Sequence, residues 1–215
     1  MRRRVAPWLA LGALVAWLAV ETVEGRAPWA PEAWRHLRRV KDRAALPPLT
    51  VDMTIEQFAE LPALEPLARY ALLEARGVRV EGYVQRIERS LDGDLHLTLV
   101  SVPEGHPGRG ARYLTAEVTP LWQRRSGWTF ERLAAELRSG HGRSTPPPGG
   151  PRRARLSGWL MNDLWYQDLP AWAFDRAHRV SGWEVHPVTR IELWDEAGQR
   201  FGDLRPHTGL RTAMR

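Results

Sequence analysis

The stretch SGWEVHPVTRIELW, Ser181 to Trp194, decides how the chain folds. Its apolar and polar residues alternate, which predicts a half-buried β-strand. Trp183 and Val185 are expected to point into a core, which leaves Glu184 and His186 on the opposite, solvent-facing side. Pro187 has no N–H to donate, so it predicts an edge or a bulge at that point of the strand. Glu184 and His186 are therefore either residues that bind a ligand or ordinary residues on the solvent-exposed face of the strand.

Four earlier segments carry the same alternation and predict four further strands. They are VRVEGYVQRIER (78–89), LHLTLV (95–100), YLTAEVTP (113–120) and RARLSGWLMND (153–163). Gly82 allows a bend in the first of them, and Asp92-Gly93 predicts a tight hairpin turn between the first two. Leu95, Leu97 and Leu99 share the face expected to be buried.

One helix is expected between the third and fourth strands, over GWTFERLAAELRS (127–139), capped by Thr129. An oligonucleotide/oligosaccharide-binding (OB) barrel has this order along the chain: three antiparallel strands, a helix and two more strands. The sequence thus predicts a mainly β protein with a five-stranded OB-like Greek-key barrel. An open five-stranded α+β sheet is the alternative.

The same segments resemble a group of small exported bacterial proteins. The shared motifs are DGDLH (Asp92 to His96), AEVTP (Ala116 to Pro120), GWL (Gly158 to Leu160) and WEVHPVT (Trp183 to Thr189), with Val185 where the group has isoleucine. The likeness spans residues 78–194. The group has no established activity, so the resemblance implies an OB-like fold and an extracytoplasmic compartment only.

The N-terminus predicts a membrane-directed segment. MRRR precedes an uncharged run from Val5 to Val20, which as a helix would cover about 24 Å, less than the ~30 Å of a bilayer core. A cleaved signal peptide and an uncleaved signal anchor stay open as alternatives, and both place the rest of the chain outside the cytoplasm, at the inner membrane or in the periplasm. The expected division is a signal segment at 1–25, a basic proline-rich tether at 26–50, a helical extension at 51–77, the barrel at 78–194 and a disordered tail at 195–215.

Composition limits the chemistry that the chain can perform. The 215 residues include no cysteine, which excludes disulfides, thiolate metal sites and a catalytic thiol. The net charge of +6 suits a polyanionic partner, but the arginines are spread along the chain rather than gathered in one stripe. Arg86, Glu88, Asp92 and Asp94 resemble the arginine and carboxylate residues of barrel nucleases, yet such residues also make ordinary hairpins.

A polar set on three strands is the candidate metal site. Asp94 and His96 share one face, as do Glu184 and His186, and Glu117 is expected between the two histidines if the third strand lies between the second and fifth. Strands are ~4.8 Å apart, so both imidazoles could share a divalent ion such as Zn²⁺ with a carboxylate. The alternative is a polar cluster in which carboxylates simply fix the imidazoles.

The loop at 163–180 is the candidate ligand-binding segment. It carries aromatic and basic side chains that could stack on bases or sugars: Trp165, Tyr166, Trp172, Arg176 and Arg179. The alternative is a loop that folds its aromatic residues over the end of the barrel, since the chain has 11 tryptophans. The sequence favours a binding module for a polyanion, a glycan or a protein over the alternative, a metal-dependent hydrolase or nuclease that uses His96, Glu117, Glu184 and His186.

Overall fold

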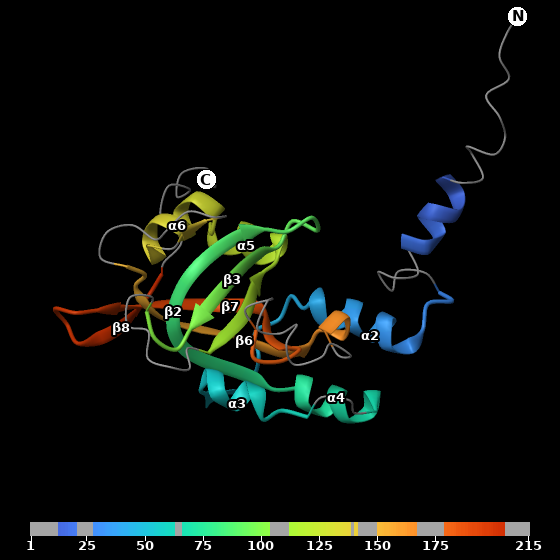
Figure 1. The fold of residues 1–215 in the computed structure, drawn as a ribbon, viewed down its shortest axis with the longest axis horizontal. Coiled ribbons are helices and arrows are strands. Elements are labelled where there is room, and N and C mark those ends of the chain that lie inside the picture. Colours follow the sequence, from blue (N-terminus) through green and yellow to red (C-terminus); the bar gives the residue numbers. More distant parts are fainter. Residues whose placement is uncertain are drawn as a thin grey trace, which may run out of the picture. The chain divides into compact units, whose positions relative to one another are not determined.

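The computed structural model describes residues 13–20, 28–62, 66–103, 112–138, 140–141, 150–166 and 179–204 (Figure 1). The chain divides into two units, residues 1–42 and 43–215. Each unit is described by itself.

The N-terminal unit contains two helical segments. Residues 13–20 are helical, and the rest of the predicted apolar run lies outside the described residues. Helix α2 (Glu32–Lys41) carries Glu32 in its first turn and basic residues in its last, which matches the helix dipole. In the part of the chain that the structure describes, no helix has the length and apolar character needed to cross a membrane.

The second unit is mainly β and contains a closed five-stranded barrel. The barrel strands are β2 (Gly77–Arg89), β3 (Leu95–Val100), β4 (Tyr113–Val118), β6 (Arg153–Asn162) and β7 (Trp183–Asp195). They follow one another as β2-β3-β4-β7-β6, and β6 pairs with β2 to complete the circle. The β4–β7 neighbours are parallel and the other four pairs are antiparallel. Closure rules out the open sheet that the sequence left as an alternative.

Strand β2 closes the barrel because it is long enough to pair with two neighbours. Residues 77–83 pair with β6, and residues 83–89 pair with β3. Gly82 lies at this change of partner, where a Cβ atom would be 2.9 Å from the carbonyl oxygen of Val100. A larger residue would therefore crowd the backbone at Gly82, and the irregularity in the register of β2 lies just beyond it, between Val84 and Arg86.

Inward-facing residues of all five strands form the core, as the alternation predicts. Fully buried members are Val80, Val84, Leu97, Leu99, Leu114, Ala116, Leu156 and Val185. Helix α6 (Phe130–Leu137) adds Leu133 and Leu137 to this core, and Thr129 caps it as predicted by accepting the N–H of Arg132 at 3.2 Å. Helix α5 (Pro120–Ser126), which precedes it, was not predicted.

Three short strands among the described residues lie where the sequence predicts none. Strand β1 (Thr50–Met53) pairs in parallel with β2 at the start of the predicted helical extension, before α3 (Ile55–Ala59) and α4 (Leu67–Glu74). Strand β8 (Arg200–Asp203) pairs with β7 within the predicted disordered tail. Strands β1 and β8 have only four residues each and are largely exposed, so neither contains the longer alternating run that identifies a strand in a sequence. The two-residue strand β5 (Gly140–His141) pairs with β2.

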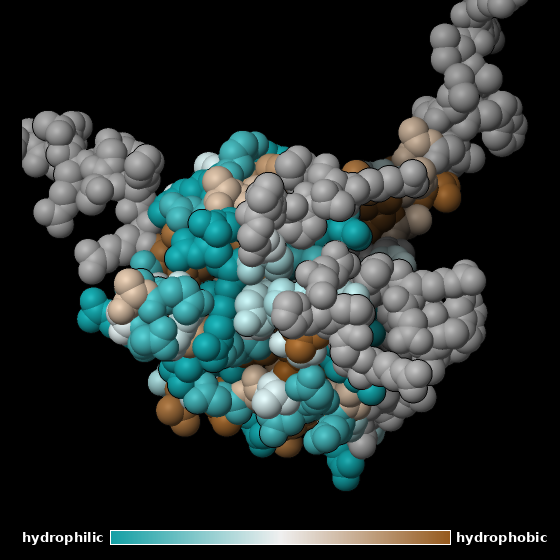
Figure 2. Space-filling model, turned by 60° about the vertical axis from the view of Figure 1, so that its left-hand side comes forward, coloured by the Kyte–Doolittle hydropathy of each residue, from teal (hydrophilic) through white to brown (hydrophobic). Residues whose placement is uncertain are grey.

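Several arginines on β2, β6 and β7 are paired with acidic residues. Arg155 contacts Glu81 at 3.0 Å, and Arg190 contacts Asp203 at 2.6 Å. The face in Figure 2 shows mainly hydrophilic residues with separate hydrophobic spots.

Candidate functional site

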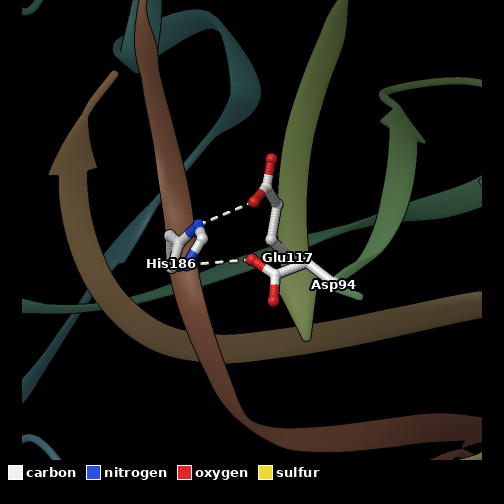
Figure 3. Close-up of side chains that lie close together, drawn as sticks. All are labelled: Asp94, Glu117 and His186. Atoms are coloured by element: carbon white, nitrogen blue, oxygen red, sulfur yellow. Dashed lines mark ion pairs between the residues drawn. The ribbon is translucent and has the colours of Figure 1, made fainter. Parts of the chain in front are cut away.

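Glu117 on β4 lies between the two histidines, as the strand order predicts. It is the register partner of His96 on β3, and its Oε1 is 3.0 Å from His96 Nε2. Its Oε2 is 2.8 Å from Nδ1 of His186, which reaches it from β7 (Figure 3). One carboxylate therefore connects three neighbouring strands of the barrel wall.

His186 is surrounded by three carboxylates. Besides Glu117, Nδ1 lies 3.1 Å from Glu184 Oε1, and Nε2 lies 3.5 Å from Asp94 Oδ2. Glu184 reaches the same ring because residues two apart on a strand share a face. Asp94, at the start of β3, completes the cluster (Figure 3).

The cluster is buried, which corrects one prediction from the sequence. His186 and Glu184 are 0% exposed and Glu117 is 2% exposed, although these residues were expected on a wet face at the mouth of the barrel. Alternation predicted correctly that they point away from Trp183 and Val185. It does not report whether other parts of the chain cover that outer face.

Arg179 forms the next layer of the cluster. Its guanidinium donates a hydrogen bond to Glu184 Oε2, lies 3.6 Å from Asp163 Oδ2 and stacks 4.0 Å from the ring centre of Tyr166. Asp163 follows β6, and Arg179 precedes β7, so both described ends of the β6–β7 connection attach to the cluster. The aromatic loop and the polar set, predicted as separate candidate sites, thus meet at the Arg179–Glu184 pair.

The charges of the cluster shift the pKa values of its members. Burial lowers the pKa of His186, but Glu117 and Glu184 outweigh it and raise the value from 6.5 to about 10. Burial raises the pKa of Glu117, but the two imidazoles outweigh it and hold the value well below 4.5. Burial, with the charge of Glu184, raises the pKa of Asp163 to about 6 against the opposing effect of Arg179.

Two bulges in β7 change which of its residues face the core. Gly158 of β6 pairs with Val188 and Leu160 pairs with Val185, so His186 and Pro187 together face the single residue Trp159. This confirms the predicted irregularity at Pro187. A second bulge follows, since Ser157 pairs with Arg190. Each bulge shifts the alternation by one residue, and Val188 and Ile191 therefore remain in the core.

Of the predicted ligand-binding residues, the structure describes Trp165, Tyr166 and Arg179. Trp165 is 60% exposed, on the short 3₁₀ turn Leu164–Tyr166. Arg179 was expected to face a ligand, but it is 6% exposed because it is bound to Glu184. Trp172 and Arg176 lie outside the described residues.

Three residues of the predicted metal site have side-chain ligand atoms close to one another. Asp94, Glu117 and His186 offer ligand atoms within 4.8 Å of one another. Glu184 is paired with Arg179, and His96 contacts the far oxygen of Glu117. Of the nuclease-like residues, Asp92 serves the hairpin turn, where its Oδ1 accepts the backbone N–H of Asp94 at 3.3 Å.

Asp163 was not predicted as a member of the site. It stands at the end of a strand, where a carboxylate usually only caps the following turn, and it does accept the N–H of Trp165 at 3.1 Å. The sequence signal that could have placed it is its position at the start of the segment that returns to Arg179.

No model of a known protein family matches the chain, and a search of curated proteins found no significant match.

Proposed function

We propose that the chain is a non-enzymatic binding domain, an OB-like Greek-key barrel that works outside the cytoplasm. The order of the barrel strands supports the OB-like architecture. The basic N-terminus, the apolar run after it and the resemblance to exported proteins support the compartment.

The burial of the His-carboxylate cluster carries the choice of binding over catalysis. A hydrolase must bring its acid, base or metal within hydrogen-bond reach of the substrate. Glu184 and His186 are 0% exposed, and Glu184 is already bonded to Arg179. Of the four residues that the hydrolase alternative requires, His96 alone has a substantially exposed side chain, at 40%.

Trp165 is the best-placed ligand contact. Its side chain is 60% exposed, and its backbone is fixed by Asp163, which is itself tied to the cluster through Arg179. An exposed aromatic ring beside the end of a barrel strand can stack on a nucleobase or a sugar ring. We therefore assign the ligand to molecules with such flat faces, and the paired arginines of β2 and β6 argue against charge alone as the basis of recognition.

Trp165→Ala tests this assignment. The probes are a single-stranded DNA oligonucleotide and a neutral oligosaccharide, titrated by calorimetry. We expect the variant to bind its probe ~10–100-fold more weakly, since stacking contributes about 1–3 kcal/mol per base. The melting temperature is expected to stay unchanged.

Trp29→Ala is the matched control, because Trp29 is 63% exposed but belongs to the N-terminal unit. It is expected to bind like the wild type. Failure of the wild type to bind either probe, or equal losses in both variants, would contradict the assignment.

A further inference from the structure

We propose that Asp94, Glu117 and His186 bind a divalent cation, Zn²⁺ or a transition metal with similar ligand preference, inside the barrel wall. The three residues come from neighbouring strands of the barrel. Asp94 immediately precedes β3, Glu117 lies in β4 and His186 lies in β7. Their ligand atoms lie within 4.8 Å of one another, which allows bonds of about 2.0–2.2 Å to one central ion after small adjustments.

Two buried atoms of this group have no hydrogen-bond partner among the described residues. They are His186 Nε2 and Glu117 Oε2, the latter close to His186 Nδ1 but without the geometry of a hydrogen bond. Both residues are almost completely buried, at 0% and 2% exposure. A buried polar atom without a partner is costly, so atoms of this kind mark a place where a ligand completes the bonding.

The contacts of His186 identify the nitrogen that would bind the metal. Nδ1 lies 3.1 Å from Glu184 Oε1 and 2.8 Å from Glu117 Oε2, whereas Nε2 lies 3.5 Å from Asp94 Oδ2 and has no hydrogen bond among the described residues. Metal-binding histidines usually donate their other N–H to a carboxylate, which fixes the orientation of the ring. Glu184 fills that role here, and its bond from Arg179 holds it in place.

The charges of the cluster also favour a dication. Arg179 pairs with Glu184, and the carboxyl groups of Asp94 and Glu117 both lie next to His186. A divalent cation would neutralise the charge of two carboxylate ligands. One nitrogen and two oxygens suit Zn²⁺ or Mn²⁺ better than Ca²⁺ or Mg²⁺, which prefer oxygen ligands.

The ion would act as a structural tie. It would join the β2–β3 hairpin to β4 and β7, and through Glu184 and Arg179 to the connection that carries Trp165. This inference does not rest on the proposed ligand binding, because it is argued from Asp94, Glu117 and His186 and not from Trp165.

The test uses the full chain purified without a histidine tag. Metal content is measured after dialysis, and protein stripped with a chelator is titrated with Zn²⁺, Mn²⁺, Ca²⁺ and Mg²⁺ separately. We expect about one Zn²⁺ or Mn²⁺ per chain and a higher melting temperature when the ion is restored. Asp94→Asn and Glu117→Gln should each weaken metal binding by at least ~10-fold.

Glu131→Gln is the matched control, because Glu131 is an exposed carboxylate paired with Arg89. It should bind metal like the wild type, as should Trp165→Ala. The inference fails if folded wild-type protein shows neither heat of binding nor a change in melting temperature with any of the four ions. It also fails if Glu131→Gln loses as much affinity as Glu117→Gln. The titration of the wild-type protein tests whether the site binds metal even if a variant does not fold.

Discussion

Single residues of the buried cluster show how far sequence reasoning reaches. The position of Glu117 between His96 and His186 followed from the alternation of the strands together with the spatial strand order of the expected OB-like layout. The burial of Glu184 and the role of Asp163 did not, because alternation assigns a side chain to a face without showing what covers that face. The partner of Glu184, Arg179, lies before the strand begins, where no periodic pattern applies.

Asp163 gives a residue-scale prediction about pH. Its pKa is raised from 3.8 to about 6 in the folded protein, first by burial and then by the charge of Glu184. The folded state therefore binds the proton more tightly than the unfolded state, and this group lowers stability as the pH rises from about 4 to about 6. An asparagine side chain at this position cannot ionise and keeps an oxygen for the N–H of Trp165. We expect Asp163→Asn to gain stability relative to the wild type over that range, measured by urea denaturation.

Asp52→Asn is the opposite-sign control for this measurement. The hydrogen bond from Arg79 lowers the pKa of Asp52, so this carboxylate stabilises the folded state above about pH 4. The variant should lose stability relative to the wild type as the pH rises. Parallel curves for Asp163→Asn and the wild type would show that Asp163 has no raised pKa.

At the scale of elements, β7 explains both a success and a failure of sequence reasoning. Its apolar residues predicted a strand, and Pro187 predicted an irregularity, but two bulges change which residues face the core. The sequence signal is the spacing of three from Val185 to Val188 and again to Ile191, in a strand that otherwise repeats every second residue. Strands β1 and β8 had no comparable signal, because each has four mostly exposed residues.

The first bulge predicts a strict requirement for glycine on the neighbouring strand. A Cβ atom at Gly158 would clash with the carbonyl oxygen of Pro187 and lie 2.8 Å from Cγ1 of Val185. Gly158→Ala should therefore lower the free energy of unfolding by about 1–3 kcal/mol, measured by urea denaturation.

Gly202→Ala on β8 is the control for this substitution, because nothing lies within 4 Å of its added Cβ atom. It should change stability by no more than about 0.5 kcal/mol. If the two variants lost similar amounts of stability, the close contact between Pro187 and Gly158 would not be the reason that β6 requires glycine at position 158.

At the scale of the whole molecule, the barrel strands were predictable because each buries one face, and their order suggested closure. The pairing of β2 with β6 that completes the barrel is a long-range contact, which no local pattern reports. The prediction of the compartment uses a different kind of signal, namely the charge and hydropathy of the residues at the N-terminus.

The predicted compartment can be tested with the full chain. A reporter enzyme that is active only outside the cytoplasm, fused after Arg215, should be active in a bacterial host. The same fusion without residues 1–25 should be inactive, because the basic and apolar segment that directs export is removed. Activity of a cytoplasm-dependent reporter in the full-length fusion would overturn the localisation.

The place of β7 between β4 and β6 also sets the order in which the molecule can assemble. Chains are made and delivered from the N-terminus, and β7 is the last barrel strand along the chain. Until it arrives, β4 lacks one neighbour and the carboxylates of Asp94 and Glu117 lack the imidazole of His186. Closing the barrel therefore waits for nearly the whole chain and removes charged groups from water in the same step, which makes the arrival of β7 the expected slow event of folding.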